Sequence, residues 1–310
     1  MAQFNVSGLS TYTDEISGEL IKKTLLAGNT MSKAGISKNP GIKSAKNLNI
    51  LTSTIVGADG AGCGFTDAGE TAYTVVPLSV DPIKVEKSFC LNTLETKWLQ
   101  VGLNPGSYPE DLAFEDVLTS EQSTLISRMV DSQIWLGNKA TGSGNLALAD
   151  GIITKIDAAS ASTINVSSTG FTSATAIAKV DEYAALIPSE MASAGNVTLY
   201  MSFSEFSKYT VALREKNYFH ITPDFNTADG VKHPGMDNLM VVPVMGLGGS
   251  VRKVIAADGN LQIGFDLESD SSEFQRWYSL DAQALRYRIR YKLGTAVAFP
   301  SQTVNISDLV

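Results

Sequence analysis

The chain has 310 residues, of which 44% are hydrophobic and 18% charged, and this composition excludes wholesale disorder. Its formal net charge of −8 argues against a surface that grips nucleic acid throughout, because phosphate binding requires an excess of Lys and Arg. Two cysteines and two histidines are too few for a disulfide framework or a zinc site, so we expect no metal and no cofactor.

The N-terminal segment is basic although the whole chain is acidic. Its first 50 residues contain six lysines against three acidic residues. An amphipathic stretch around Ile16 and Leu20 predicts a short helix that stops at Gly28, and residues 33–46 are typical of an extended arm. No apolar signal segment and no run of about 18 apolar residues occurs, so we expect a protein that stays in a cytosol-like space without a membrane partner.

Two strand-like segments, 49–56 and 73–85, flank a glycine-rich stretch at 57–69. This arrangement predicts a long hairpin. A loop of this length without secondary structure is uncommon inside a compact domain, so we expect the tip to protrude toward a partner. A plain surface loop is the alternative.

The clearest helix is predicted over 109–136. A capping box of Ser107 and Glu110 with Pro109 marks its start, and Gly137 marks its end. The core of an ordinary α+β enzyme could contain such a helix as well. The apolar stripe is expected to consist of Phe114, Leu118, Leu125, Met129 and Leu136.

The following segments predict a mixed α+β order. The expected elements are a strand at 151–156, a helix at 173–187, a strand at 197–201, a helix from a cap at Ser202 and Glu205 to about residue 216, a strand at 239–245, and a hairpin at 251–265 that turns at Asp258 and Gly259.

The last predicted strand, 285–293, alternates apolar and basic residues strictly. One face is therefore apolar, and the other carries Arg286, Arg288, Arg290 and Lys292. Such a face could meet nucleic acid or carboxylates. Because no stacking aromatic residue lies on the same face, we favour salt bridges within or between subunits.

No constellation of catalytic residues stands out, and we predict that the chain is not an enzyme. Residues 41–44 lack the spacing and the preceding strand of a phosphate-binding loop. His220 or His233 could act as a base beside a carboxylate, but structural roles are the better interpretation. The acidic run 266–273 does not match a calcium loop, so we interpret it as a solvated turn.

Four segments carry a resemblance to a known family. They are 80–94 at the return of the hairpin, 135–138 at the end of the long helix, 150–153 after it, and 285–300 with its late glycine and proline. In this order, behind a basic arm, they resemble the tailed-bacteriophage major capsid proteins with the Hong Kong 97 shell fold, an α+β class.

The resemblance implies a division of the chain. It comprises an N-terminal arm at 1–46, an extended hairpin loop at 47–100 with its tip at 57–69, a peripheral domain at 101–164 with the spine helix 109–136, an axial domain at 165–275, and closing strands of the peripheral domain at 276–310.

The resemblance also implies the function and the partners. Many copies of the chain would assemble, as pentamers and hexamers, into an icosahedral shell around double-stranded DNA, which they contact without sequence specificity. Assembly would take place in the cytoplasm of a host bacterium, with a portal and a separate scaffold or cement protein as further partners. The alternatives are an encapsulin-like compartment and a cytosolic α+β enzyme with an unrecognised site.

Two departures from the family limit these expectations. No lysine lies between Lys46 and Lys84, so the hairpin tip cannot supply a crosslinking lysine and we expect a non-covalent shell. The hairpin begins near residue 47, which leaves no room for a cleaved scaffold segment. The residues expected to contact neighbouring subunits are Lys33, Lys38, Lys43, Lys46, Gly60, Gly62, Phe65, Asp67, Arg286, Arg288 and Arg290.

Overall fold

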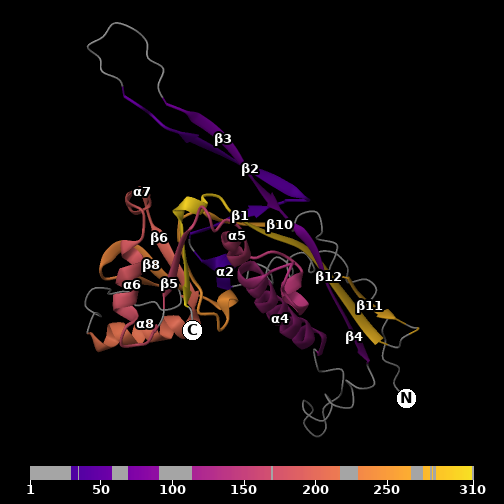
Figure 1. Ribbon diagram of the computed structural model, residues 1–310. Helices are drawn as coiled ribbons and strands as arrows, with labels where there is room; N and C mark the ends of the chain where they lie inside the picture. The colour runs from indigo at the N-terminus through magenta and orange to yellow at the C-terminus, as the bar shows by residue number, and fades with distance from the viewer. Residues whose placement is uncertain are drawn as a thin grey trace.

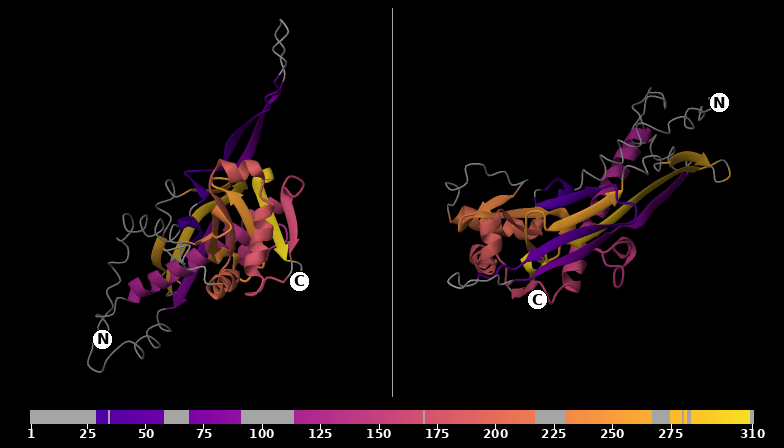
Figure 2. Two further views of the ribbon diagram at one scale, coloured as in Figure 1. Left: turned by 90° about the vertical axis from the view of Figure 1, so that its left-hand side faces the viewer. Right: turned by 90° about the horizontal axis from the view of Figure 1, so that it is seen from above.

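The computed structural model describes residues 29–33, 35–57, 69–90, 114–168, 170–216, 230–266, 275–279, 281 and 284–308. They form a body of two sheets with helices packed on them, and a two-stranded ribbon projects from this body (Figure 1; Figure 2). The α+β class expected from the sequence is confirmed.

The first sheet has five strands in the order β1-β10-β12-β11, with β4 also paired to β12. These strands are β1 (Ile36–Pro40), β4 (Asp81–Cys90), β10 (Leu261–Asp266), β11 (Gln275–Ser279) and β12 (Ala284–Val297). The ribbon consists of β2 (Ala45–Ser53) and β3 (Thr71–Ser79).

The second sheet has six strands in the order β5-β13-β9-β6-β8-β7. They are β5 (Ile164–Ser168), β6 (Val197–Ser202), β7 (Val231–His233), β8 (Met236–Val244), β9 (Lys253–Ala257) and β13 (Thr303–Asp308). The helices are α2 (Asn29–Ser32), α4 (Phe114–Leu136), α5 (Ile152–Ala158), α6 (Ala176–Ala185), α7 (Ser189–Ala194) and α8 (Phe203–Glu215), with short 3₁₀ turns at Gly144–Ala147, Met245–Leu247 and Pro300–Gln302.

Strand β12 has the alternation that the sequence predicts. Tyr287, Ile289, Tyr291 and Leu293 are buried in the same hydrophobic cluster as the inner residues of α4. The basic residues between them face the other way, because successive side chains of a strand point to opposite faces. The apolar side of β12 therefore packs against α4, and its cationic side chains lie on the opposite side of the strand.

Helix α4 confirms the predicted long helix over 114–136, while 109–113 lie outside the described residues. Of the predicted stripe, Met129 and Leu136 pack against the core, and the side chains of Phe114 and Leu118 lie outside the described residues. Leu125 is wrong, since its side chain is 44% exposed, and Ile126, Val130 and Ile134 are buried instead.

Polar residues on the buried side of α4 explain this error. Gln122 accepts a hydrogen bond from the hydroxyl of Tyr287 at 3.0 Å, and Gln133 accepts one from Tyr291 at 2.9 Å. These bonds satisfy polar groups that would otherwise be costly to bury. The true inner face therefore contains glutamines and looks polar in the sequence.

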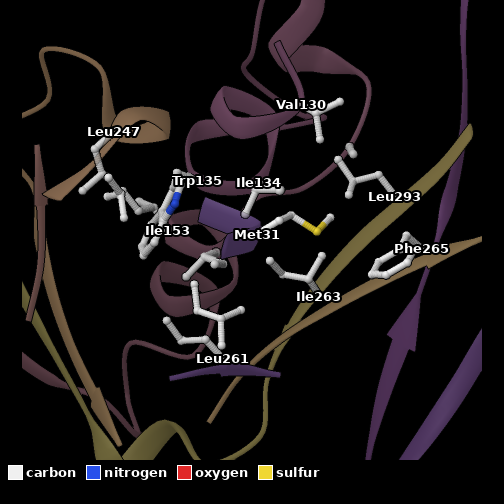
Figure 3. Packing of buried hydrophobic residues seen from close by; sticks show 14 of the residues in the cluster. Met31, Val130, Ile134, Trp135, Ile153, Leu247, Leu261, Ile263, Phe265 and Leu293 are labelled. Carbon is white, nitrogen blue, oxygen red and sulfur yellow. The ribbon is translucent and has the colours of Figure 1, made fainter. Parts of the chain in front are cut away.

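Residues 29–40 are part of the body, so the prediction of an extended arm over 33–46 is wrong for its first half. The indole N–H of Trp135 donates to Thr30 Oγ1 at 2.9 Å, and Met31 lies in the core near Ile134 (Figure 3). Strand β1 pairs in parallel with β10. The lysine-rich composition concealed the few apolar residues that anchor this segment.

Both faces of the six-stranded sheet are buried. Along β6, Val197 and Leu199 pack in the cluster that contains α6 and α8, whereas Tyr200 between them packs in the cluster that contains α4. The ring centroids of Tyr200 and Trp135 lie 5.2 Å apart. This sheet is thus the middle layer that joins the two halves of the body.

The expected helix at 173–187 is confirmed as α6, with α7 after it. The strands expected at 197–201 and 239–245 are confirmed as β6 and β8. The helix expected from 203 to about 216 is confirmed as α8, which ends at residue 215.

Residues 151–156 were predicted as a strand and instead begin helix α5. The amide of Gly151 donates to the carbonyl of Gly137 at 2.8 Å, and a Cβ on Gly151 would lie only 2.7 Å from the Gly137 nitrogen. This close approach brings the start of α5 against the end of α4. Isoleucines at 152, 153 and 156 suit a buried helix face as well as a strand, so local composition could not decide between them.

The hairpin predicted at 251–265 is also wrong as a pairing. Strand β9 pairs with β6 and β13, whereas β10 pairs with β1 and β12. The turn at Asp258 and Gly259, where Gly259 has φ +79°, carries the chain from one sheet to the other. The alternation of apolar and polar residues predicts strands well, but it does not determine which strands pair with each other.

The base of the ribbon crosses the first sheet at a pair of glycines. Gly264 of β10 and Gly294 of β12 lie opposite each other in the register. A Cβ on Gly294 would overlap with the carbonyl oxygen of Ser79, and one on Gly264 would lie 3.1 Å from the side chain of Leu78. The absence of two side chains therefore allows β3 to pack directly on the sheet.

We expect Gly294→Ala to destabilise the subunit by about 1–3 kcal/mol, the usual range for overpacking at a filled site. Chemical denaturation measures this change. Gly249→Ala is the matched control, because a Cβ at Gly249 would meet no heavy atom within 4 Å. Equal stability of the two variants would contradict a steric role for Gly294.

Candidate assembly surfaces

The register of the ribbon divides its residues into two faces. Leu51 lies opposite Tyr73 and Asn49 opposite Val75, and directly paired residues share a face. We call the first set the odd face; it consists of Asn47, Asn49, Leu51, Ser53, Thr71, Tyr73, Val75 and Pro77. The even face consists of Lys46, Leu48, Ile50, Thr52, Ala72, Thr74, Val76 and Leu78.

The odd face is exposed along its whole length. The exposed fractions are 66% for Leu51, 63% for Tyr73 and 45% for Val75. Beyond the end of β2, Ile55 is 93% and Val56 58% exposed. Contiguous exposed apolar residues of this kind usually mark a surface for protein association.

The even face is used by the subunit itself. Leu78 is fully buried in a small cluster with Ile42, Val80 and Ala296, and Leu48 and Val76 pack against this cluster. Anchoring is therefore confined to the base of the ribbon and to one of its faces.

The lysines predicted as contacts lie in different environments. Lys33 is buried within the subunit, so its prediction as a contact is wrong. Lys38, Lys43 and Lys46 are exposed, and Lys46 Nζ donates to Asn39 Oδ1 at 2.9 Å. The four predicted tip residues Gly60, Gly62, Phe65 and Asp67 lie outside the described residues.

The basic face of β12 is accompanied by charges from β4. Arg288 Nε donates to Glu86 Oε1 at 2.7 Å, and Lys84 Nζ donates to Glu86 Oε2 at 3.3 Å. These contacts keep the pKa of the Glu86 carboxyl below its ordinary value, chiefly through the hydrogen bond from Lys84. Arg286 and Arg290 are exposed. For Arg288, the predicted salt bridge is thus made within the subunit.

The acidic run 266–273 was interpreted as a solvated turn, and its first residue does not fit this interpretation. Asp266 is buried, and Lys292 Nζ lies 3.4 Å from its Oδ2. The other acidic residues of the run lie outside the described residues. Within the described part of the chain, no three His, Cys, Asp or Glu side chains converge as a metal site would require.

His233 has a buried environment. Its Nε2 lies 2.8 Å from Asp181 Oδ1, its Nδ1 lies 2.9 Å from the hydroxyl of Tyr209, and its side chain is 1% exposed. Burial raises the pKa of Tyr209 above its ordinary range. The three side chains join β7 to α6 and α8, and a substrate has no access to the imidazole. His220, the other candidate base, lies outside the described residues.

The predicted capping box of α8 is not formed. Glu205 instead makes a buried ion pair, with Oε2 2.7 Å from Lys253 Nζ, while Lys208 Nζ donates to its Oε1 at 2.8 Å. Lys253 is fully buried, donates to the Val251 carbonyl at 3.0 Å and lies 4.5 Å from the centre of the Phe171 ring. This network joins α8 to β9 inside the second half of the body.

No family model matches the chain, and no curated protein matches it. Solved structures do match. The satellite phage P4 procapsid with its size determination (Sid) protein has a TM-score of 0.59 at 13% identity, covering 99% of this chain and 96% of that one. A solved structure from Gordonia phage Cozz has a TM-score of 0.57 at 14% identity, covering 100% of this chain and 92% of that one. The capsid of Myoviridae phage XM1 reaches 0.57 at 12% identity, covering 91% and 92%.

The chain has the Hong Kong 97-like fold of phage capsid proteins. The match spans nearly the whole chain, so the two sheets and the ribbon together follow the capsid-protein arrangement. Among the described helices of this capsid fold, none has the length and apolar character needed to cross a membrane.

Three exposed apolar residues of the ribbon were missed as candidates in the sequence. The hairpin was predicted, but Leu51, Tyr73 and Val75 look like ordinary strand residues. Only the register shows that they share one face and that the subunit leaves this face uncovered. The sequence itself indicates only that such residues stand at alternate positions along a strand, as residues on one face do.

We expect Glu86→Gln to lower the melting temperature at neutral pH and to have a progressively smaller effect as the pH falls below 4.5. The folded pKa of Glu86 is depressed, so its stabilising contribution is present above the ordinary value of 4.5 and is lost as the pH falls through the lower folded value. Thermal unfolding at several pH values measures this. An equal difference between variant and wild type at all pH values would contradict the assignment.

We expect Lys253→Met to cost about 3–5 kcal/mol, because it leaves the Glu205 carboxylate buried without its closest cation. Lys208→Met is the matched control. Its ammonium group pairs with the same carboxylate but its side chain is 43% exposed, so we expect a cost below about 1 kcal/mol. Urea denaturation of both variants distinguishes them, and equal costs would contradict the buried role of Lys253.

Proposed function

We propose that this chain is the major capsid protein of a tailed bacteriophage and that many copies assemble into an icosahedral shell around double-stranded DNA. The observation that carries the proposal is the capsid-protein fold over nearly the whole chain, combined with a projecting ribbon that leaves Leu51, Tyr73 and Val75 exposed on its odd face. A compact enzyme has no evident use for such a ribbon, whereas a shell subunit must reach its neighbours.

Each part of the chain has a role in this proposal. The N-terminal arm predicted over 1–46, apart from the part that is built into the body, reaches neighbouring subunits, and the ribbon lies across a neighbour. Helix α4 is the spine of the peripheral half. The half that contains the six-stranded sheet meets its copies at the centres of pentamers and hexamers. Portal, scaffold and cement proteins are further proposed partners, and assembly takes place in the host cytoplasm.

The shell is held together without covalent links, because no lysine lies between Lys46 and Lys84 to serve as a crosslinking residue at the hairpin tip. The subunit carries out no reaction of its own in this proposal. The burial of His233 supports this assignment, since its two ring nitrogens contact Asp181 and Tyr209 inside the subunit.

An encapsulin-like compartment is the second candidate. The virus-like particle from Pyrococcus furiosus has a TM-score of 0.51 at 9% identity, with 93% of this chain covered. The contents of purified particles distinguish the two functions, since a phage shell packages DNA and a compartment packages protein.

We expect the purified chain to form closed particles or rings of pentamers and hexamers, seen by size-exclusion chromatography and negative-stain electron microscopy. Boiling in detergent should release a single band at 33.0 kDa, because the shell is non-covalent. A stable monomer under all assembly conditions would contradict the proposed function.

Deletion of residues 58–68 should leave the subunit folded and abolish assembly. This segment lies beyond the described ends of the ribbon, so its removal takes nothing from the described core. Circular dichroism checks the fold and electron microscopy checks the particles. Normal shells from the deleted chain would overturn the role of the tip.

A further inference from the structure

Three exposed lysines surround the place where β1 leads into the ribbon (Figure 1). We call Lys38, Lys43 and Lys46 the basic patch. We propose that the basic patch contacts the phosphate backbone of the packaged double-stranded DNA, in place of the contact between subunits that the sequence predicted for these lysines. This inference deepens the proposed function and rests on it.

The distribution of charge along the sequence sets this region apart. From Leu20 to Ala58 no residue is acidic and six are lysines, although the whole chain has 32 acidic residues against 24 basic ones. Lys33 is buried within the subunit, whereas the three lysines of the basic patch are exposed. An acidic protein therefore displays a local cationic surface.

The charges of the basic patch are not neutralised by the subunit. Among the residues that the structure describes, none forms an ion pair with Lys38, Lys43 or Lys46. Strands β1, β2 and β3, which lie next to these lysines, contain no acidic residue. The three ammonium groups are thus available to an anionic partner.

Acidic residues at the ends of the neighbouring strands already have other contacts. Asp266, the last residue of β10, is buried with Lys292 Nζ 3.4 Å from its Oδ2. Asp81, the first residue of β4, lies 2.8 Å from Lys139 Nζ. Asp258 lies at the other end of β1, in the turn before β10. These carboxylates therefore leave the basic patch cationic.

The backbone that carries the basic patch is fixed to the body. Strand β1 pairs with β10 from Ile36 to Pro40. After it, Ile42 is buried in the cluster at the base of the ribbon, and the amide of Val80 donates to the carbonyl of Ser44 at 2.9 Å. A phosphate contact at this surface costs little ordering of the main chain, because the main chain is already held in place.

Neutral side chains orient one of the three cations. Lys46 Nζ donates to Asn39 Oδ1 at 2.9 Å, and Asn39 Nδ2 donates to Gln262 Oε1 at 2.7 Å. Amide groups carry no net charge, so these hydrogen bonds position the ammonium group without cancelling its charge. Two further protons of this ammonium group remain for phosphate oxygens.

The composition of the surface favours nucleic acid over an acidic protein as the partner. Between Lys38 and Lys46 the only large aliphatic side chain is Ile42, and it is buried. Protein interfaces are poor in lysine and depend on apolar residues at their centre, whereas surfaces that contact DNA are polar and strongly positive. Duplex DNA presents one phosphate charge per about 1.7 Å of its axis, so three lysines can contact it without reading its sequence.

The salt dependence of DNA binding counts these contacts. The decisive variant combines Lys38→Gln, Lys43→Gln and Lys46→Gln in unassembled subunits, whose binding to a fluorescent DNA duplex is followed by anisotropy at several salt concentrations. Loss of three phosphate contacts should lower the slope of log K against log salt by about 2.7 and the affinity at low salt by more than about tenfold. Circular dichroism checks that the variant folds.

Arg214→Gln, Lys216→Gln and Lys232→Gln together form the matched control. These three residues are also exposed, and their replacement removes the same total charge from α8, its end and β7. We expect the control to bind DNA with the wild-type slope. An equal loss in both variants would show that only total charge matters, and no DNA binding by the wild-type subunit would equally overturn the inference.

Acetylation of lysines in particles identifies what covers the basic patch. We expect Lys38, Lys43 and Lys46 to react several-fold more slowly in DNA-filled particles than in the same particles after release of the DNA. Slow reaction in both states would show that a protein, such as an acidic partner or another subunit, covers the patch. Fast reaction in both would show that the patch faces solvent, and either result would overturn the inference.

The two levels of the proposal fail differently. If no DNA-containing particle of this chain can be isolated, the proposed function itself fails. If such particles exist and the three lysines react equally with and without DNA, the proposed function stands and the assignment of the basic patch is wrong.

Discussion

The close crossing of the ribbon over the first sheet is the contact on which the rest of the structure depends. Gly264 and Gly294 face each other on β10 and β12, and their missing side chains let Ser79 and Leu78 approach the backbone of the sheet. The chain then continues into β4, which pairs with β12 along ten residues. The ribbon and the sheet are therefore fixed to each other at this close contact.

Buried polar groups fix the position of α4 over the same sheet. An apolar stripe alone would tolerate slippage of a helix, whereas hydrogen bonds from Tyr287 to Gln122 and from Tyr291 to Gln133 are satisfied at one position only. Asp131 adds a third fixed point, because its carboxylate accepts a hydrogen bond from the Thr30 amide at 3.2 Å. The sheet, α4 and α2 thus hold the base from which the ribbon projects.

Strong periodicity made some of this fold predictable from the sequence. The alternation in β12, the C-terminal end of α4 and the two strands of the ribbon all depend on local patterns. The buried side of α4 could not be predicted from local patterns, because Gln122 and Gln133 are buried through hydrogen bonds with tyrosines more than 150 residues away. The helix α5 and the change of sheet at Asp258 and Gly259 likewise depend on contacts between distant segments.

The candidate assembly surfaces were likewise predictable from the sequence only in part. The sequence predicted that a hairpin would reach a partner, and four of the proposed contacts at its tip, Gly60, Gly62, Phe65 and Asp67, stay predictions. The contacting face could not be chosen without the register, since Leu51 and Ile50 look alike in the sequence but differ in exposure. Lys33 shows the opposite error, a charged residue taken as surface that the fold buries.

A cryo-electron microscopy reconstruction of the purified assemblies, at a resolution that separates the strands, tests the central claim most directly. We expect β2 and β3 to lie on an adjacent copy, with Leu51, Tyr73 and Val75 against that copy and Leu78 still packed over Gly264. A ribbon that folds back on its own subunit, or that points into solvent with Tyr73 uncovered, would contradict it.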